Sequence, residues 1–256
     1  MPAPPATTFM LGRQRVDLYD KGHGPAVLLL HELPGLSRAT LNLVDRLVAD
    51  GYHVYYPRLF GDYGETQTGP ALPLSVCRNG EFHCLSKDVP AAPLIKFIRE
   101  SVFPKMRSDG ATQTVVIGMC LTGSVGVALL NDDLVRGAVM SQPALPFALG
   151  RSRLAALGLT DDEIKDAKAS HKPILAFRFT NDCISPPERM EHFEHVFGPQ
   201  MTVMQIDSSP CNAAGVPGNS HAVLTLSHHP SEPHYPTNDA MTALEEFLNR
   251  TLRSTH

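Results

Sequence analysis

Apolar residues along the chain form short, mostly unbroken runs that alternate with segments of helical period. Runs of strand length occupy residues 26–31, 53–60, 114–120, 137–145, 174–182 and 201–207. Between them, apolar side chains recur every three or four positions, at 40–50 and 88–107, as in a helix with one buried face. Strands that are apolar on both faces and separated by helices predict a mostly parallel α/β sheet with helices on both sides.

Local signals add detail to this alternation. Residues 1–25 predict either a loose arm or an edge hairpin around 9–19. Thr160 with Glu163 forms a capping box that opens a helix. Two more helices are expected at 187–197 and 239–252, and Pro104 is expected to end or bend the helix that contains it. The long irregular stretch 61–86 predicts a lid or substrate loop. No linker interrupts the alternation, so we expect residues 1–256 to form a single domain.

Composition narrows the class of protein. The 22 basic and 26 acidic residues give a net charge of −4, which disfavours binding to nucleic acid. The N-terminus lacks the features of a secretory signal, and no apolar run reaches the length of a membrane span. Five cysteines without a pairing pattern argue against a disulfide framework. We therefore expect a cytoplasmic monomer or homodimer that acts on a small molecule, with no cofactor or metal.

The most informative motif is Gly118-Met119-Cys120-Leu121-Thr122-Gly123, which lies where a buried strand meets a helix. A nucleophile elbow needs a sharp strand-to-helix turn flanked by small residues. The start of a helix also favours a thiolate, because its free backbone N–H groups point outward. A buried cysteine that only fills space is the alternative. The setting favours Cys120 as a nucleophile.

Asp182 and His221 complete a candidate catalytic triad. Asp182 ends a predicted strand, and His221 follows the last strand and a loop. Alone, Asp182 would be a turn residue and His221 an ordinary loop histidine, but the chain order nucleophile, acid, histidine is that of α/β-hydrolases. An oxyanion hole would then use the backbone N–H of Leu121 and that of Leu33, in the loop after the first buried strand.

Two histidine-containing segments suggest metal sites only weakly. His31 and Glu32 begin a segment of the HExx form, but no second histidine follows and Pro34 opposes a helix there. Glu32 without a function would be a solvated residue at a strand end. The histidines near the C-terminus are read as a hydrated loop in preference to a metal site, because no helical or CxxC frame holds them (His228, His229 and His234).

These motifs together resemble the dienelactone hydrolase family. The matching pieces are LLLHELPGL with Glu32, GMCLTG with Cys120, TND with Asp182 and SHA with His221. The resemblance implies an α/β-hydrolase fold and hydrolysis of a small ester or lactone. It also implies that Glu32 lies against the thiol and keeps it protonated until substrate binds.

The chain departs from the family pattern at two positions. Thr122 replaces a glycine of the elbow, and Thr225 stands where the family has an arginine that binds a carboxylate. An anionic substrate is therefore poorly supported, unless Arg78 in the long loop supplies the cation. A protein of this fold that binds or senses a ligand without turnover is the alternative function. A redox protein that pairs Cys120 with Cys183 or Cys211 is a second.

Overall fold

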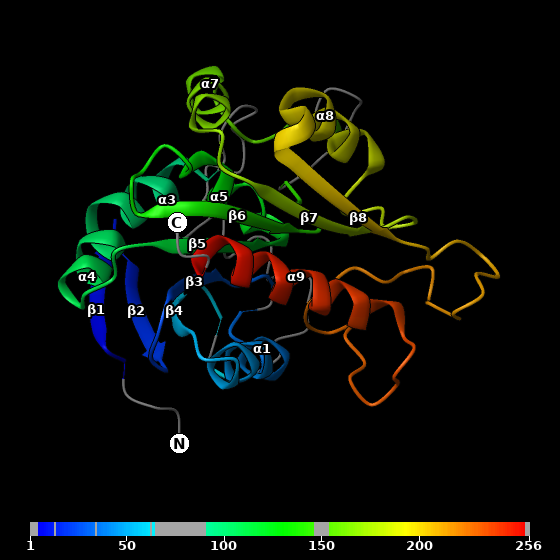
Figure 1. Cartoon of the computed structure of the whole chain (residues 1–256), viewed down its shortest axis with the longest axis horizontal. Coiled ribbons are helices and arrows are strands. Elements are labelled where there is room, and N and C mark those ends of the chain that lie inside the picture. The colour runs from blue at the N-terminus through cyan, green and yellow to red at the C-terminus, as the bar shows by residue number, and fades with distance from the viewer. Residues whose placement is uncertain are drawn as a thin grey trace.

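The computed structural model describes residues 5–12, 14–33, 35–61, 63–64, 91–145 and 154–253. Its centre is one eight-stranded sheet (Figure 1). The strands are β1 (Thr7–Leu11), β2 (Gln14–Lys21), β3 (Ala26–Leu30), β4 (His53–Arg58), β5 (Thr114–Met119), β6 (Val135–Ser141), β7 (Ile174–Phe179) and β8 (Met201–Ile206).

The strand order is β1-β2-β4-β3-β5-β6-β7-β8. The six strands from β4 to β8 in this order run parallel, and the β1–β2 hairpin joins β4 antiparallel at one edge. This is the α/β-hydrolase arrangement that the sequence predicts, including the edge hairpin. Because the carboxyl ends of the parallel strands meet at one edge, side chains that follow β3, β5, β7 and β8 gather there.

Helices cover both faces of the sheet (Figure 1). One face is packed against α1 (Arg38–Ala49) and α9 (Pro236–Leu252). The other is covered by α3 (Ala92–Phe97), α4 (Phe103–Ser108), α5 (Val125–Ala128), α7 (Asp161–Ser170) and α8 (Pro187–Phe197). Alternate residues of each strand point to opposite faces, so Leu28 and Leu30 pack on the second side and Val27 and Leu29 on the first.

Helix ends follow local capping chemistry. The Ser37 side chain accepts a hydrogen bond from the Thr40 N–H at 3.2 Å, so α1 begins two residues before the predicted start. The capping box is confirmed: Thr160 Oγ1 accepts from the Glu163 N–H at 3.1 Å, and Glu163 Oε2 accepts from the Thr160 N–H at 2.9 Å. α9 also begins earlier than predicted, at Pro236, which suits the first turn of a helix.

Pro104 was predicted to end or bend its helix, and the structure shows that it does not end it. The chain remains helical from Ala92 to Ser108, with a π-helical turn over Ile98–Val102 between α3 and α4. This turn shifts the hydrogen-bond pattern just before Pro104, which then occupies the first turn of α4, where its missing N–H costs little.

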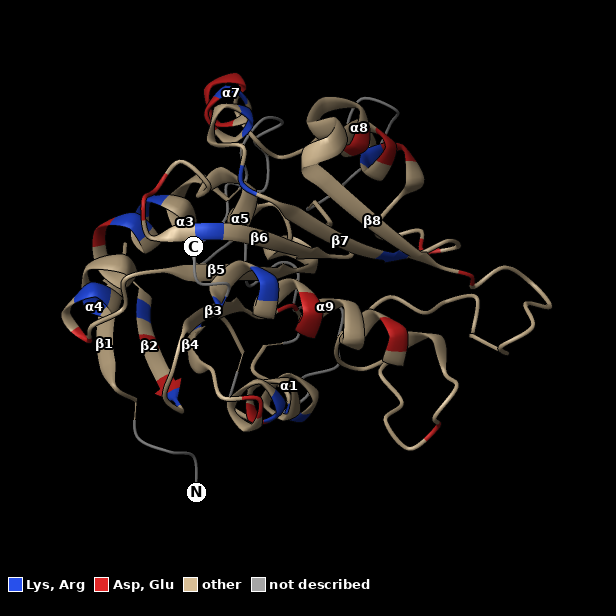
Figure 2. Cartoon of the chain, in the orientation of Figure 1, with Lys and Arg blue, Asp and Glu red and all other residues tan. Residues whose placement is uncertain are grey.

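Lys and Arg alternate with Asp and Glu around the helices (Figure 2), and several form ion pairs such as Arg107 with Asp132. Within the part of the chain that the structure describes, no helix is long and apolar enough to span a membrane. Most of the predicted loop 61–86, Arg78 included, lies outside the described residues.

Candidate active site

The candidate site lies between β3 and β5, at the point where the strand order reverses direction. These two strands are neighbours, with Leu30 beside Gly118, yet the helix that follows β3 and the helices that precede β5 cover opposite faces. A crevice therefore opens beyond their carboxyl ends, which is where open α/β sheets bind ligands. Glu32 and Cys120 each come two residues after this register pair.

The turn after β5 is as tight as a nucleophile elbow requires. Cys120 has a φ of 53°, a left-handed conformation that is strained for a residue with a side chain. A Cβ on Gly118 would lie 2.1 Å from the Thr122 carbonyl oxygen, and one on Gly123 would lie 2.7 Å from Pro143 Cα. Neither backbone atom has room to move, so both positions require glycine.

Thr122 fits this turn without loosening it. Its side chain is fully buried, and its hydroxyl accepts a hydrogen bond from the Met119 N–H at 2.9 Å. The same hydroxyl lies within donating distance of two carbonyl oxygens, that of Met119 at 2.9 Å and that of Leu30 at 3.0 Å. The threonine thus ties the turn to the end of β3, a contact that a glycine cannot make.

A short 3₁₀ turn, Cys120–Thr122, follows the strand, and the predicted helix after it is reduced to α5. The Cys120 carbonyl accepts from the N–H groups of Gly123 and Ala144, each at 2.9 Å, so the turn is held by backbone on two sides. Leu121 occupies the second position of the turn, where backbone N–H groups lack an intrahelical partner. Cys120 itself is only 6% exposed.

Asp182 and His221 are brought together by the turn after β7 and the loop after β8. Asp182 Oδ2 lies 2.7 Å from His221 Nδ1. The other carboxylate oxygen, Oδ1, accepts from the N–H groups of Ile184 and Ser185 at 2.9 and 3.1 Å. Because the carboxylate can only accept, it holds the imidazole with its proton on Nδ1 and leaves Nε2 for another partner.

Cys120 is the candidate for that partner. Among the described residues, His221 Nε2 is buried without a hydrogen bond of standard geometry. Burial lowers the pKa of His221. Its interactions with Asp182 and with the Cys120 sulfur raise the pKa by more, so that the net value is about 10. The imidazole therefore interacts with both the Asp182 carboxylate and the Cys120 sulfur.

The loop that carries His221 is fixed by polar side chains. Asn181 Nδ2 donates to the Gly218 carbonyl at 2.8 Å, three residues before the histidine. Asn212 makes a reciprocal pair with Val216, in which its Nδ2 donates at 2.7 Å and its Oδ1 accepts at 2.9 Å. These contacts tie the loop to β7 and to itself.

The idea that Glu32 is merely solvated is wrong, since the residue is 2% exposed. Gln142 Nε2 donates to its Oε2 at 2.7 Å, and the Thr225 hydroxyl bonds its Oε1. Burial raises the pKa of Glu32, although Thr225, His221 and Gln142 each lower it in part. Among the described residues, one carboxyl oxygen of Glu32 is thus bonded to Gln142 and the other to Thr225. Neither oxygen has a hydrogen bond to Cys120. Gln142 is not predicted as a site residue from the sequence. The only signal for it is the polar pair Ser141-Gln142 within the apolar run 137–145.

His31 has a structural role. It is fully buried, with Nδ1 3.0 Å from the Glu32 carbonyl oxygen and Nε2 accepting from the Leu59 N–H at 3.0 Å. Burial lowers its pKa to about 4, so the ring is neutral at physiological pH. No group of three metal-ligating side chains occurs among the residues described by the structure, His228, His229 and His234 included.

The remaining cysteines do not form a pair with Cys120 in the described part of the chain. Cys183 and Cys211 are exposed and free, whereas Cys120 is buried. This arrangement gives no support to the redox alternative. Cys77 and Cys84 lie outside the described residues.

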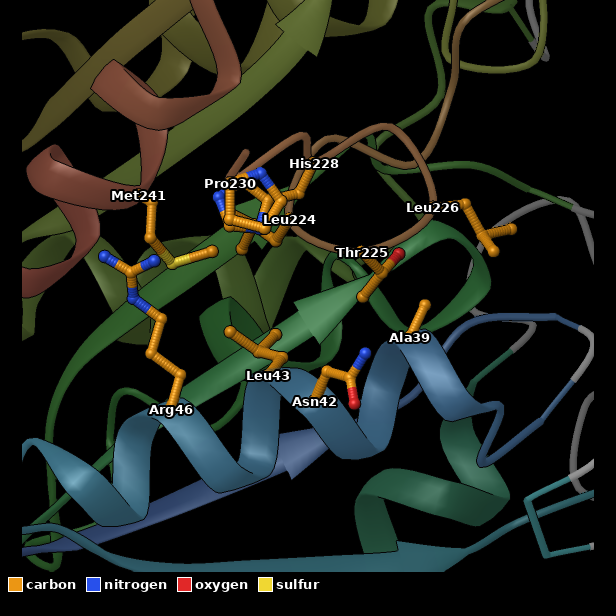
Figure 3. A pocket seen from close by; sticks show the side chains of 10 residues that line it. All are labelled: Ala39, Asn42, Leu43, Arg46, Leu224, Thr225, Leu226, His228, Pro230 and Met241. Carbon is orange, nitrogen blue, oxygen red and sulfur yellow. The ribbon is translucent and has the colours of Figure 1, made fainter. Parts of the chain in front are cut away.

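Two neighbouring cavities flank the segment after His221. One, of about 350 Å³, is lined by Glu32, Leu33, Pro217, Asn219, Ser220, His221, Ala222, Leu226, Ser227, His229 and Tyr235. The other, of about 550 Å³, lies between α1, α9 and the same segment (Figure 3) and is lined by Thr225 and Leu226 among others. The larger cavity contains no member of the candidate triad, so the smaller one is the candidate substrate pocket.

Comparison with known families agrees with this geometry. The family model of the dienelactone hydrolases matches residues 16–252. The chain belongs to the dienelactone hydrolase family. A search of curated proteins finds no significant match.

Solved structures extend the likeness in fold. A candidate dienelactone hydrolase from Klebsiella pneumoniae is similar at 18% identity and a TM-score of 0.61, over 91% of this chain and 93% of that one. A cold-adapted esterase from an Arctic intertidal metagenomic library is similar at 13% identity and a TM-score of 0.61, over 96% and 93%. The esterase of Exiguobacterium antarcticum is similar at 14% identity and a TM-score of 0.55, over 90% and 96%.

Proposed function

We propose that this α/β-hydrolase cleaves a small, uncharged ester or lactone through Cys120, with His221 as the base and Asp182 as its orienting partner. The observation that carries the proposal is one half-buried imidazole that is hydrogen-bonded to a carboxylate and whose pKa is also raised by a cysteine sulfur. That arrangement is what nucleophilic catalysis by a thiol requires.

The reaction would proceed in two steps. Cys120 Sγ attacks the carbonyl carbon while its proton is held on His221 Nε2, and this proton then goes to the leaving alkoxide. Water, activated by the neutral His221, hydrolyses the resulting thioester and restores the thiol. Asp182 stabilises the imidazolium that exists between these transfers.

The oxyanion of each tetrahedral intermediate would bind to the backbone N–H groups of Leu121 and Leu33. Leu121 follows the nucleophile in a 3₁₀ turn, and Leu33 lines the 350 Å³ cavity beside Glu32 and His221. The hydroxyl of Thr122 bonds the end of β3, which leads to Leu33, so the two donors share one support. Loss of one such donor costs about 3–4 kcal/mol of transition-state stabilisation in comparable sites.

The charge of the pocket supports a neutral substrate. Among its described lining residues, ionisable side chains are Glu32, His221, His229 and Tyr235, with no Lys or Arg. Thr225 occupies the place of the family's carboxylate-binding arginine, and its hydroxyl is already bonded to Glu32. A carboxylate on the substrate would therefore meet the acidic Glu32 and, among the described lining residues, no Lys or Arg, because the charge of His221 is already paired with Asp182.

Hydrolysis of p-nitrophenyl acetate by the purified protein tests the proposal. We expect turnover by the wild type and a fall to background in both Cys120→Ala and His221→Gln. Cys211→Ser is the matched control, because Cys211 is exposed and lies outside the site. An ester of the same alcohol whose acyl group ends in a carboxylate should react more slowly.

Background turnover by the folded wild type across short esters and lactones would reject the hydrolase and favour a ligand-binding or sensing protein. Full activity of Cys120→Ala would reject this nucleophile. Mass spectrometry of the protein quenched during turnover should reveal the acyl group on the peptide that contains Cys120.

A further inference from the structure

Gln142 is a buried, strained residue at the edge of the site, and the proposed chemistry does not use it. It directly follows β6, has a φ of 36° and is fully buried. A left-handed backbone is unfavourable for a residue with a Cβ, and such strain persists only where the surroundings enforce it. Here the Gln142 N–H donates to the Phe177 carbonyl at 2.7 Å, which anchors the backbone to β7.

The orientation of the Gln142 amide is fixed by its neighbours. The backbone N–H of Val223, which can only donate, lies 3.3 Å from Oε1. The hydroxyl of Ser141 donates to the same oxygen. The amide nitrogen must therefore face the other way, where it donates to Glu32 Oε2 at 2.7 Å.

Glu32 carries the connection further. Its second oxygen is bonded by the hydroxyl of Thr225. Val223 and Thr225 come two and four residues after His221. Gln142 therefore holds this segment at Val223, and Glu32 holds it at Thr225. Asp182 holds the imidazole at Nδ1, and the network holds the backbone just beyond it.

We propose that Gln142 is a positioning residue that keeps the His221 imidazole against Cys120, acting through Glu32 and the backbone of Val223. The Glu32 carboxyl group in this network is bonded by two uncharged donors, the amide of Gln142 and the hydroxyl of Thr225. The proposal rests on the proposed function only in taking Cys120 and His221 as the reacting pair.

The test is the rate at which iodoacetamide alkylates Cys120, followed by peptide mass spectrometry from pH 6 to 10. Site-resolved detection separates Cys120 from the exposed cysteines, and no substrate is needed. Gln142→Leu removes all three hydrogen bonds of the amide, those to Ser141, Val223 and Glu32. We expect it to lower the rate at pH 7 by about tenfold, because a misplaced imidazole no longer stabilises the thiolate.

Gln142→Glu gives a readout that a purely structural role would not move. The new carboxylate can still accept from Val223 and Ser141, but its other oxygen faces Glu32. One shared proton preserves the contact at low pH, whereas two ionised carboxylates repel each other. The alkylation rate relative to the wild type should therefore fall as the pH rises, unlike that of Gln142→Leu.

Exchanging the two groups should rescue the network. In the double variant Glu32→Gln with Gln142→Glu, the amide and the carboxylate trade places and every donor still meets an acceptor. We expect its rate at pH 7 to return to within about threefold of the wild type. Gln200→Leu is the matched control: this side chain also donates twice, to Ala167 and Lys172, but it lies at the amino end of β8, at the sheet edge opposite the site.

Wild-type alkylation kinetics in folded Gln142→Leu would overturn the proposal. So would matching pH profiles for Gln142→Leu and Gln142→Glu, or a double variant no better than either single one. Failure of the proposed function looks different: His221→Gln would then alkylate at the wild-type rate, or the wild type would not turn over esters while the Gln142 variants still changed the thiol.

Discussion

Two segments deliver the candidate nucleophile and base to the same edge of the sheet, and they are held by different forces. The nucleophile turn, residues 118–123, is fixed by close backbone packing that only glycine allows at two positions. The histidine segment, residues 207–227, is a long loop fixed by side-chain hydrogen bonds from Asn181, Asp182, Asn212 and Gln142.

The difference teaches where each half of the site is vulnerable. Packing of backbone against backbone cannot relax, so errors in the nucleophile turn should appear mainly as lost stability. A loop held by polar contacts can shift by a fraction of an ångström while the fold survives, so errors in the histidine segment should appear mainly as lost activity. Three experiments probe this contrast.

The largest effect is expected for Asp182→Asn, in the support of the histidine segment. Asparagine can keep the contacts of Oδ1 to Ile184 and Ser185, but its NH₂ would face His221 and favour the tautomer with the proton on Nε2. The base then cannot accept the thiol proton. We expect kcat for p-nitrophenyl acetate to fall by about 10³–10⁴-fold, in a variant that thermal unfolding shows to be folded at the assay temperature.

Asp207→Asn is the control for this change, since that carboxylate is exposed and bonds Ser209. An Asp182→Asn variant that stays within a few-fold of the wild type would show that the histidine segment does not depend on its carboxylate.

The next effect concerns the nucleophile turn and stability. In Gly118→Ala, the new Cβ would lie 2.1 Å from the Thr122 carbonyl oxygen, and we expect the free energy of unfolding to fall by about 3 kcal/mol or more. Gly215→Ala is the matched control: its φ of 67° is also positive, but no atom lies within 4 Å, so strain alone should cost about 1 kcal/mol. Urea titrations compare the two, and equal losses would remove close packing as the reason for Gly118.

The most gradual effect is a pH dependence of stability that comes from His221. Its pKa is about 10 in the folded protein, against about 6.5 in an unfolded chain. The folded state then binds the proton more tightly, so this stabilisation is complete below pH 6.5 and is lost as the pH rises through 10. The contribution should decline by at most about 1.4 kcal/mol per pH unit.

Urea titrations between pH 6.5 and 10 measure this slope, and His221→Gln provides the reference for all other titrating groups. We expect the wild type to lose more stability over this range than His221→Gln. Parallel pH profiles would mean that the imidazole is not held in its charged form by Asp182 and Cys120.

Prediction from sequence succeeded where the determining contacts are local. The alternation of apolar runs and helical segments predicts the parallel sheet, and the capping box at Thr160 predicts the start of α7. The turn around Cys120 is equally local, because Gly118 and Gly123 lie within three residues of it. Chain order and the placement at strand ends predict that Asp182 and His221 accompany the cysteine, and the structure has Asp182 2.7 Å from His221.

What failed depends on contacts between distant residues. The Gln142 amide acquires its role from Glu32, 110 positions earlier, and from the backbone of Val223. The burial of Glu32 has the same origin, since its partner Thr225 lies 193 positions away. Pro104 was misjudged because a proline rule does not foresee a π-helical turn that makes room for the ring.

The hydroxyl of Thr122 has a consequence for how this fold could be tuned by evolution or in the laboratory. It ties the turn that carries the thiol to the neighbouring strand β3, and it does so from a fully buried position. Replacing the threonine by serine or glycine would weaken or remove these hydrogen bonds without changing the reactive sulfur. A single substitution at this position would therefore change how rigidly the turn that carries Cys120 is held.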